Sequence, residues 1–501
     1  MTTKLSFFLL FTVSFISAIF WNEFNKQELR NSGIALRNNV TVITNDDYSY
    51  LAPFDSFLKN DSFYTDELRK YTTVIRSPGY GGIYYVCSII FGRNNALYCF
   101  SILQMTLFAF SVYYLFRIAE LVSLPRKIAF LIAVFYGFLP FSIGFLNYTL
   151  TEGVTPSLLI FCYFFFFKGF YCAQKKSKNL NYLFASLVFT LLFVVRPILG
   201  IFIVPIFLVL IKDLWNEKKH LTFTVKISIF LVVSFSLYAI WEMRNRYVLG
   251  KWTSLHPIYQ NEIPGVFRFP HEKAWEFFKG WESSGAHFHE TILPFWEQTM
   301  KLDTTYQPIN RFVDRIPKEV INSIGKEAIV EALKCYRKAI LAQKPFFDAG
   351  KVMSQYPLGS EKLAAFKFNQ LAQTYRKKNP LNYFLLTPMK VLKNMTFHSN
   401  LSLYVFQVSQ RGHWYIEILR VICLLVHFLI FLLLPLSLIF TQKKLLLFLM
   451  NITMIIYVFY LAFFQRGIEE RYTLPILPFL ILISIYSLWY FYLRMKSARK
   501  S

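Results

Sequence analysis

Nine long apolar stretches constrain the fold of this chain more than any other feature. Each is at least 17 residues long, which is the length that an α-helix needs to cross the hydrocarbon core of a membrane. The composition agrees, with 55% hydrophobic and 19% aromatic residues among 501, and it excludes a soluble globular protein. The sequence therefore predicts an all-α polytopic membrane protein. The apolar stretches are 5–21, 97–116, 128–146, 153–171, 180–212, 226–242, 414–440, 445–464 and 472–493.

The stretch 180–212 is too long for one span, and Arg196-Pro197 interrupts it. A proline inside an apolar run breaks a helix, so we expect two short helices there and about ten spans in all. Residues 5–21 compete with a cleaved signal peptide, but no small-x-small cleavage site follows. We expect a retained anchor with its N-terminus in the cytoplasm. The shorter run 78–92 is expected to form an interfacial or partly inserted helix.

Basic residues test this count of spans, because short cytoplasmic loops are rich in Lys and Arg. Alternation from a cytoplasmic N-terminus places residues 22–96 and 243–413 on the outer face. We expect an N-terminal transmembrane module (1–242), an outer helical loop domain (243–413) and a C-terminal transmembrane module (414–501). Every inner connection is then basic: Arg117, Arg126 and Lys127; Lys175, Lys176 and Lys178; Lys212, Lys218 and Lys219; Lys443 and Lys444; Arg494, Lys496, Arg499 and Lys500.

The formal net charge of +25 does not indicate nucleic-acid binding, because the basic residues divide between the inner loops and the large outer loop. Within 244–411, 24 Lys and Arg face 13 Asp and Glu. A basic domain beside a membrane suggests an anionic partner, such as lipid phosphate or a phosphorylated glycan. A generically basic soluble domain is the alternative.

The most informative short stretch follows the first apolar segment and contains two adjacent carboxylates, Asp46 and Asp47, before aromatic residues. Such an anionic site beside a membrane could take a proton from a polar group or steer it. The competing interpretation is a solvated turn or a helix N-cap.

Other ionisable residues lie near the outer ends of spans, where charge is costly and is commonly functional. Any single one is better explained by snorkelling or a structural salt bridge. Together with the Asp pair they indicate a pocket with carboxylates for a hydroxyl or amine and arginines for phosphate. These residues are Arg76, Glu152, Arg196, Arg244, Arg466 and Arg471, with Lys251 and His256 just beyond a span.

The chain resembles the membrane-embedded glycosyltransferases of the GT-C class, in particular protein O-mannosyltransferases and the aminoarabinose transferase of lipid A. The span pattern is similar over nearly the whole chain. Three motifs carry the resemblance: Asp46-Asp47-Tyr48-Ser49-Tyr50-Leu51-Ala52, Arg76-Ser77-Pro78-Gly79-Tyr80 and Arg471-Tyr472-Thr473-Leu474-Pro475. The first is similar to the family's first outer loop. The second is similar to the family's Arg-x-Pro-Gly-Tyr-Pro turn, with Gly81 in place of the last Pro, and the third to its Arg-Tyr-x-x-Pro helix start.

This resemblance implies an inverting transfer of a sugar from a polyprenyl-phosphate donor to a lipid, glycan or protein acceptor. The carboxylate of an acidic residue in the first outer loop would act as the base. We expect Asp46 to be the base, and Asp47 and Glu152 to orient the acceptor or raise the pKa of the base. Arg76 and Arg471 are the expected phosphate ligands. No catalytic metal is predicted, although the Asp pair could hold a divalent cation. The further phosphate candidates are Arg196, Arg244 and Arg466, and the substrate-binding candidates are Tyr48, Tyr50, Tyr80, Tyr472, Lys251 and His256.

Three other classes of function remain open. A secondary transporter would show repeats and charge at the membrane midplane. A flippase for lipid-linked sugar, or a polysaccharide ligase or polymerase, shares the basic outer loop without needing the Asp pair. A structural scaffold explains none of the outer-face charges. We expect a bacterial inner membrane location with the site on the periplasmic face, because no retention signal ends the chain.

Overall fold

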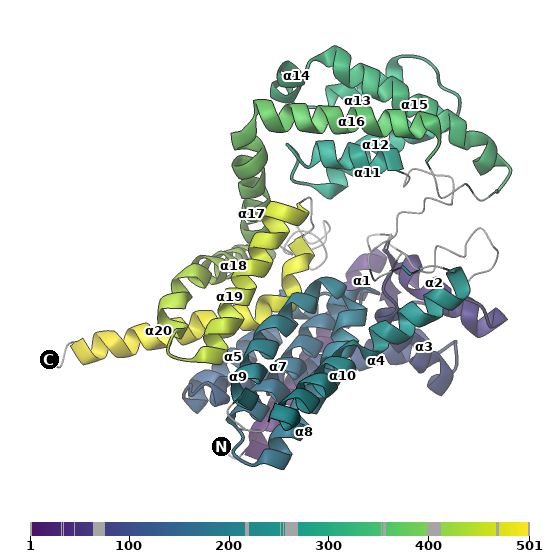
Figure 1. Cartoon of the computed structure of the whole chain (residues 1–501). Coiled ribbons are helices and arrows are strands. Elements are labelled where there is room, and N and C mark those ends of the chain that lie inside the picture. The colour runs from purple at the N-terminus through teal and green to yellow at the C-terminus, as the bar shows by residue number, and fades with distance from the viewer. Residues whose placement is uncertain are drawn as a thin grey trace.

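A computed structural model describes most of the chain, and nearly all of what it describes is helical (Figure 1). The exceptions with regular structure are the two-residue strands β1 (Leu36–Arg37) and β2 (Thr41–Val42), which form an antiparallel hairpin. The all-α fold class is therefore confirmed. The described residues are 3–31, 33, 35–44, 46–63, 76–215, 220–250, 252–253, 255, 269–351, 353, 357–397, 412–466 and 470–498.

The larger body is a helical bundle with one continuous apolar core. Its first part runs from α1 through α10, and its second part, α18 to α20, packs against α5, α7 and α9. The helices are α1 (Thr3–Asn31), α2 (Asp47–Asn60), α3 (Gly79–Phe91), α4 (Ala96–Leu121), α5 (Arg126–Phe138), α6 (Pro140–Ile143), α7 (Thr155–Tyr171), α8 (Lys175–Val195), α9 (Ile203–Trp215), α10 (His220–Leu249), α18 (Trp414–Thr441), α19 (Leu445–Tyr460) and α20 (Leu477–Ala498).

Seven helices in the described residues are long and apolar enough to cross a membrane, where the sequence predicts about ten spans. The other three predicted spans contain the shorter helices α5, α7 and α9, of 13, 17 and 13 residues. Prolines explain why two of these helices are short, because a proline disfavours the helical conformation of the residue before it. Helix α5 ends at Phe138, just ahead of Pro140, and a 3₁₀ turn, Pro197–Phe202, separates α8 from α9. The break that the sequence predicted at Arg196-Pro197 is therefore present.

The smaller body is a second set of helices with an apolar core of its own, which is made of residues between 274 and 375. It lies above the bundle in Figure 1. Gly325, with φ 96°, separates α14 from α15. The helices are α11 (Phe269–Phe278), α12 (Gly285–Met300), α13 (Gln307–Asp314), α14 (Lys318–Ile324), α15 (Lys326–Asp348) and α16 (Gly359–Lys378).

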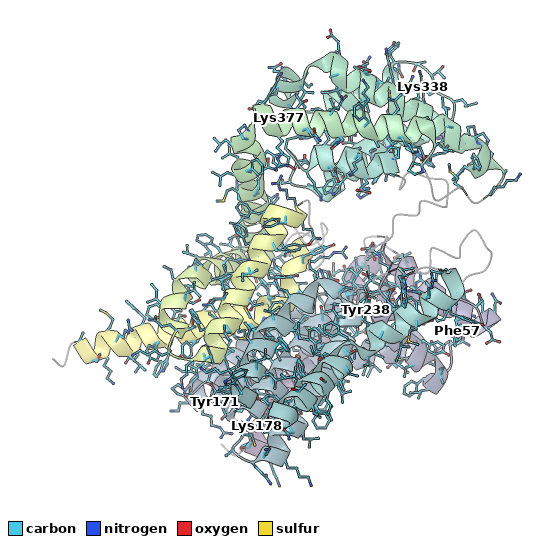
Figure 2. The ribbon with its side chains drawn as sticks, viewed as in Figure 1. Phe57, Tyr171, Lys178, Tyr238, Lys338 and Lys377 are labelled. Carbon is cyan, nitrogen blue, oxygen red and sulfur yellow. The ribbon has the colours of Figure 1, made fainter. Side chains whose placement is uncertain are left out.

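A π-helical turn, Asn382–Leu386, and helix α17 (Thr387–Phe397) connect the smaller body to the bundle (Figure 1). Figure 2 shows Lys178 at the end of the bundle far from the smaller body, which carries Lys338 and Lys377. One contact between two predicted inner connections lies at that far end. Lys178 Nζ lies 2.9 Å from Asp213 Oδ1. The division into modules 1–242, 243–413 and 414–501 stays a prediction.

Candidate functional site

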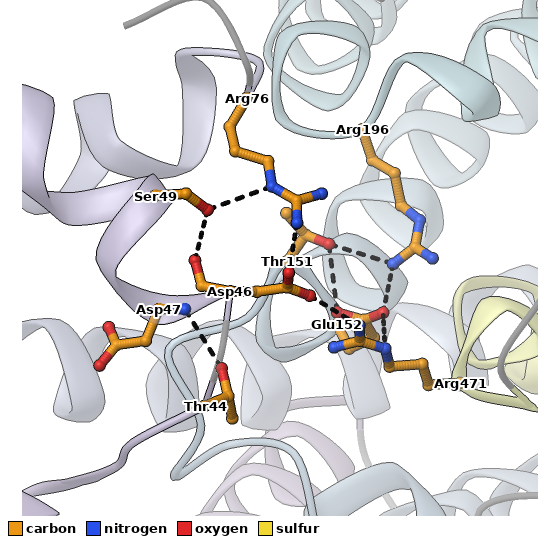
Figure 3. A network of polar contacts seen from close by, with 9 residues as sticks. All are labelled: Thr44, Asp46, Asp47, Ser49, Arg76, Thr151, Glu152, Arg196 and Arg471. Carbon is orange, nitrogen blue, oxygen red and sulfur yellow. Dashed lines mark hydrogen bonds and ion pairs between the residues drawn. The ribbon is translucent and has the colours of Figure 1, made fainter. Parts of the chain in front are cut away.

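Asp46 is the residue around which the candidate site is built (Figure 3). It occupies the N-cap position of α2, as the competing interpretation of the Asp pair required, but its side chain makes no capping hydrogen bond. Its Oδ1 instead accepts from Arg76 Nη2, and its Oδ2 accepts from Arg471 Nη2 at 2.8 Å. Asp46 and Arg471 are 425 residues apart in the chain. The first and last of the sequence motifs therefore meet at one carboxylate.

Arg76 is held by a close contact between the start of α3 and the end of α8. Arg76 Nε donates to Ser49 Oγ at 3.2 Å, and the neighbouring Ser77 Oγ donates to the carbonyl of Val195 at 3.1 Å. A Cβ on Gly79 would lie 2.6 Å from the backbone of Val194 and Val195, so only glycine allows this approach. The Pro-Gly turn thus fixes the position of the guanidinium.

Glu152 is the second carboxylate at the site and comes from a 3₁₀ turn, Thr151–Gly153, ahead of α7. It is 5% exposed, and its Oε1 lies 2.7 Å from Arg196 Nη1 and 3.7 Å from Arg471 Nε. Burial alone would raise the pKa of this carboxyl, but the two arginines outweigh burial and hold the pKa below its usual value. Glu152 is therefore ionised, and Arg471 bridges it to Asp46.

The β-hairpin brings the two carboxylates together. Val42 in β2 donates its backbone N–H to the carbonyl of Asn147 at 2.9 Å, and Thr149 Oγ1 donates to Thr41 Oγ1 at 3.3 Å. These bonds tie the loop before Asp46 to the loop before Glu152. Two loops that are distant in the sequence are thus fixed side by side.

We call these five side chains the arginine–carboxylate cluster: Asp46, Arg76, Glu152, Arg196 and Arg471. Three guanidiniums face two carboxylates, so the cluster carries one positive charge in excess. Arg196 Nη1 also donates to Thr151 Oγ1 at 3.0 Å, which fixes its orientation beside Glu152. An anion that entered the cluster would balance its charge, and a guanidinium offers the fork geometry that phosphate oxygens prefer.

Asp47 lies outside the cluster, although it is next to Asp46 (Figure 3). Its side chain is fully buried, and its Oδ2 accepts from Arg37 Nε at 2.8 Å. Burial raises the pKa of the Asp47 carboxyl above its usual value in spite of the attraction to Arg37. The sequence did not predict Arg37 as the partner of Asp47. A basic residue ten positions away has no feature that separates an ion-pair partner from a solvated side chain.

The predicted tyrosines occupy supporting positions. Arg76 lies over the ring of Tyr50 at 5.3 Å, and Arg196 lies over that of Tyr472 at 4.7 Å. Tyr80 is fully buried beneath Tyr50, with 5.4 Å between the ring centroids, and donates to Gln104 Oε1. Tyr48 belongs to α2, but its side chain is outside the described residues.

Two predicted phosphate ligands have partners away from the cluster. The Arg244 guanidinium lies over the rings of Phe63 and Trp241, at 4.7 and 5.0 Å. Arg466 donates instead to the backbone carbonyls of Phe463 and Lys279, both at 3.0 Å. Lys251 and His256 lie outside the described residues.

A cation at the Asp pair would meet competition from arginines. Asp46 already contacts two guanidiniums and Asp47 contacts a third. Within the described part of the chain, no group of three or more His, Cys, Asp or Glu residues has a geometry that could hold a metal ion.

No family model matches the chain, and no curated protein matches it. Among solved structures, the chain is similar to ArnT from Cupriavidus metallidurans in the apo state, with 11% identity, 97% of this chain and 78% of that chain covered, and a TM-score of 0.32. It is similar to the same protein bound to undecaprenyl phosphate, with 11% identity, 96% and 77% covered, and a TM-score of 0.31. ArnT is an aminoarabinose lipid A transferase, which is the group that the sequence motifs resemble. Because both TM-scores are below 0.5, we draw no residue role from this similarity.

Proposed function

We propose that the chain is an inverting glycosyltransferase that moves a sugar from a polyprenyl-phosphate donor to a cell-envelope acceptor, which is a lipid, glycan or protein. The reaction takes place at the arginine–carboxylate cluster, on the outer face of a bacterial inner membrane. The observation that carries the proposal is the meeting of Asp46 with Arg76 and Arg471. A carboxylate for the acceptor and arginines for the leaving phosphate are the groups that this reaction needs.

In the proposed reaction, Asp46 takes a proton from the acceptor hydroxyl or amine as its oxygen or nitrogen attacks the anomeric carbon. The bond from that carbon to the phosphate oxygen breaks on the opposite side, which inverts the configuration. The lipid phosphate leaves with the bonding electrons, so its negative charge grows. Guanidiniums stabilise that charge more in the transition state than in the ground state, and this difference accelerates the step.

The contacts of Asp46 imply an order of events. Both of its carboxylate oxygens accept hydrogen bonds from guanidiniums, so an acceptor hydroxyl has to compete with Arg76 and Arg471 for Asp46. A donor phosphate that binds Arg76 and Arg471 draws them away from Asp46. Binding of the donor first therefore favours deprotonation of the acceptor by Asp46. Glu152 and Arg196 keep their own ion pair and hold the site in place during this exchange.

Asp47 has a positioning role in this proposal. Its ion pair with Arg37 links the start of α2 to β1, and so it fixes the backbone from which Asp46 projects. We propose no bound metal, because a divalent cation would have to displace guanidiniums from Asp46.

The test compares Arg76→Lys and Arg471→Lys with Arg311→Lys, an exposed control in α13. Turnover is measured with a polyprenyl-phosphate sugar as donor, and thermal unfolding is measured in parallel. A lysine keeps the charge but loses the forked hydrogen bonds, so each cluster variant should lose about tenfold or more in turnover. The Arg311 variant should keep its activity.

Two active and stable lysine variants would mean that these arginines do not hold the phosphate. A flippase or a polymer ligase without chemistry at Asp46 is the alternative function. It would move the lipid-linked sugar, or join polymers, with no sugar release from the donor that depends on Asp46.

A further inference from the structure

Gln104 is a fully buried polar side chain in the long apolar helix α4. It is 0% exposed, and it lies within the stretch 97–116, whose other residues are mainly apolar. Polar side chains inside a transmembrane segment are costly, and those that are present commonly serve a function. Gln104 is not a member of the arginine–carboxylate cluster, and the proposed reaction does not use it. Its contacts, however, lead to the cluster from two sides.

The side-chain amide of Gln104 joins two segments that carry cluster residues. Its Oε1 accepts from the Tyr80 hydroxyl at 3.1 Å, and its Nε2 donates to the carbonyl of Leu146 at 3.0 Å. Tyr80 lies in the first turn of α3, shortly after Arg76, and Leu146 lies in the loop before Glu152. Glutamine suits both bonds, because its amide offers a donor and an acceptor without carrying a charge.

On the first side, Tyr80 is linked to Arg76 through the ring of Tyr50. The centroids of the Tyr80 and Tyr50 rings are 5.4 Å apart, and the Arg76 guanidinium lies 5.3 Å from the centroid of Tyr50. Tyr80 also packs edge-on against Phe100, with 5.0 Å between the centroids. A buried ring in a close-packed interior has little room to move alone. A shift of Tyr80 is therefore passed on to Tyr50 and to the guanidinium above it.

On the second side, Gln104 packs directly against the 3₁₀ turn that carries Glu152. A Cβ on Gly153, the residue after Glu152, would lie 2.1 Å from Gln104 Oε1 and 3.2 Å from the carbonyl oxygen of Phe145. Non-bonded atoms do not approach as closely as the first of these distances, so the turn can lie against the amide only because residue 153 is glycine. Gln104 thus touches the turn that positions Glu152.

We infer that Gln104 is a positioning residue, which sets the place of Arg76 relative to Glu152 in the arginine–carboxylate cluster. Glu152 Oε1 lies 3.7 Å from Arg471 Nε, so the place of Glu152 also affects that of Arg471. Both guanidiniums have to reach one leaving phosphate, and a misplacement of about 1 Å in such a site can cost about a hundredfold in rate. The effect on catalysis rests on the proposed function, whereas the effect on Arg76 itself does not.

The first test measures how fast Arg76 reacts with phenylglyoxal, an arginine reagent, in the purified full-length protein. Mass spectrometry identifies the modified arginines, and Arg466, which is buried away from the cluster, is the internal reference. Gln104→Met removes both hydrogen bonds at similar volume, so it should speed the modification of Arg76 relative to Arg466 by at least about threefold. A general loss of stability would speed both alike. The matched control Gln442→Met, at an exposed position just after α18, should leave the ratio unchanged.

The second test measures kcat and KM with a polyprenyl-phosphate sugar as donor. Folded Gln104→Met should lower kcat by about tenfold or more and change KM less, because the guanidiniums are needed most in the transition state. Gly153→Ala displaces the same amide and should have a similar effect, and the double variant should lose little more than either single variant. Absence of turnover in every protein, the unaltered one included, would contradict the proposed function, and the reactivity of Arg76 would then decide on Gln104 alone.

Unchanged reactivity of Arg76 in folded Gln104→Met would overturn the inference. Normal turnover of that variant, when the unaltered protein is active, would overturn it as well. If thermal unfolding shows that Gln104→Met does not fold, Tyr80→Phe takes its place, because it removes only the hydroxyl that binds Gln104 and keeps the contact between the rings. Tyr80→Phe should also speed the modification of Arg76, and no change in that rate would overturn the inference.

Discussion

Neighbouring aspartates have different partners in this chain, and the difference follows from the start of a helix. Asp46 precedes the first turn of α2 and faces Arg76 and Arg471, whereas Asp47 is inside that turn and is buried against Arg37. Two carboxylates that look equivalent in the sequence therefore have different environments. Asp46, whose side chain is 24% exposed, is suited to exchange its partners, and the fully buried Asp47 is not.

The ion pair of Asp47 gives a prediction for stability. Arg37→Gln removes the cation from a fully buried carboxylate, which should lower the free energy of unfolding by about 3 kcal/mol at neutral pH. The double variant Arg37→Gln with Asp47→Asn should recover most of this loss, because no buried charge then remains. Thermal and denaturant unfolding of the four proteins in one detergent measures the effect. Additive losses in the double variant would mean that the two residues do not act as a pair.

The pH dependence of that variant has a definite sign. Burial raises the folded-state pKa of Asp47 above the value for an unfolded chain. Its protonated form therefore favours folding, and stability falls as the pH rises from the unfolded pKa to the raised one. Without Arg37 the folded pKa is higher still, so the stability loss should grow from pH 5 to pH 8. A loss that is the same at both pH values would contradict the assignment of the effect to Asp47.

At the scale of elements, the start of α3 is the part of the site that glycine controls. A Cβ on Gly79 would overlap the backbone of α8, whereas one on Gly82, in the same helix, would meet no atom within 4 Å. Gly79→Ala should push α3 from α8, move Arg76 away from Asp46 and lower turnover by at least tenfold. Gly82→Ala should be neutral or slightly stabilising, since alanine favours the helix. Equal turnover of the two variants would show that this contact does not position Arg76.

The sequence predicts the elements better than it predicts their contacts. Apolar length and composition identify the helices, and Pro197 marks the break between α8 and α9. Helices α5 and α7 are shorter than the apolar stretches that predict them, because hydropathy alone does not show where a helix ends. The pairing of Asp46 with Arg471 spans 425 residues; the sequence placed both near the outer ends of spans, but no local pattern showed that they contact each other. Arg37 gave no signal, because a long-range ion pair has no local pattern.

At the scale of the whole molecule, two helical bodies meet at α17 and Arg466 (Figure 1). The smaller body carries an excess of basic residues, and two pairs of predicted inner connections contact each other in the bundle, Lys178 with Asp213 and Lys444 with Ser123. Both observations are consistent with the proposed site at the outer face of the membrane, with the smaller body above it.

This arrangement predicts which side of the membrane each end faces. A cysteine at Lys301, next to α12 in the smaller body, should react with an impermeant thiol reagent in intact cells. A cysteine at Lys176, at the far end of the bundle, should react only after the cells are opened. Both positions are exposed in the structure, so burial does not explain a difference. The reverse pattern of labelling would contradict the assignment of the outer face.

The central claim is that Asp46 performs the chemistry, and one measurement tests it most directly. Turnover of a polyprenyl-phosphate sugar is measured for Asp46→Asn and for Asp47→Asn, with thermal unfolding as the check on folding. Loss of a general base should lower the turnover of folded Asp46→Asn by about two to four orders of magnitude, whereas folded Asp47→Asn should lose less. Near-normal turnover in Asp46→Asn, or a larger loss in Asp47→Asn, would contradict the claim.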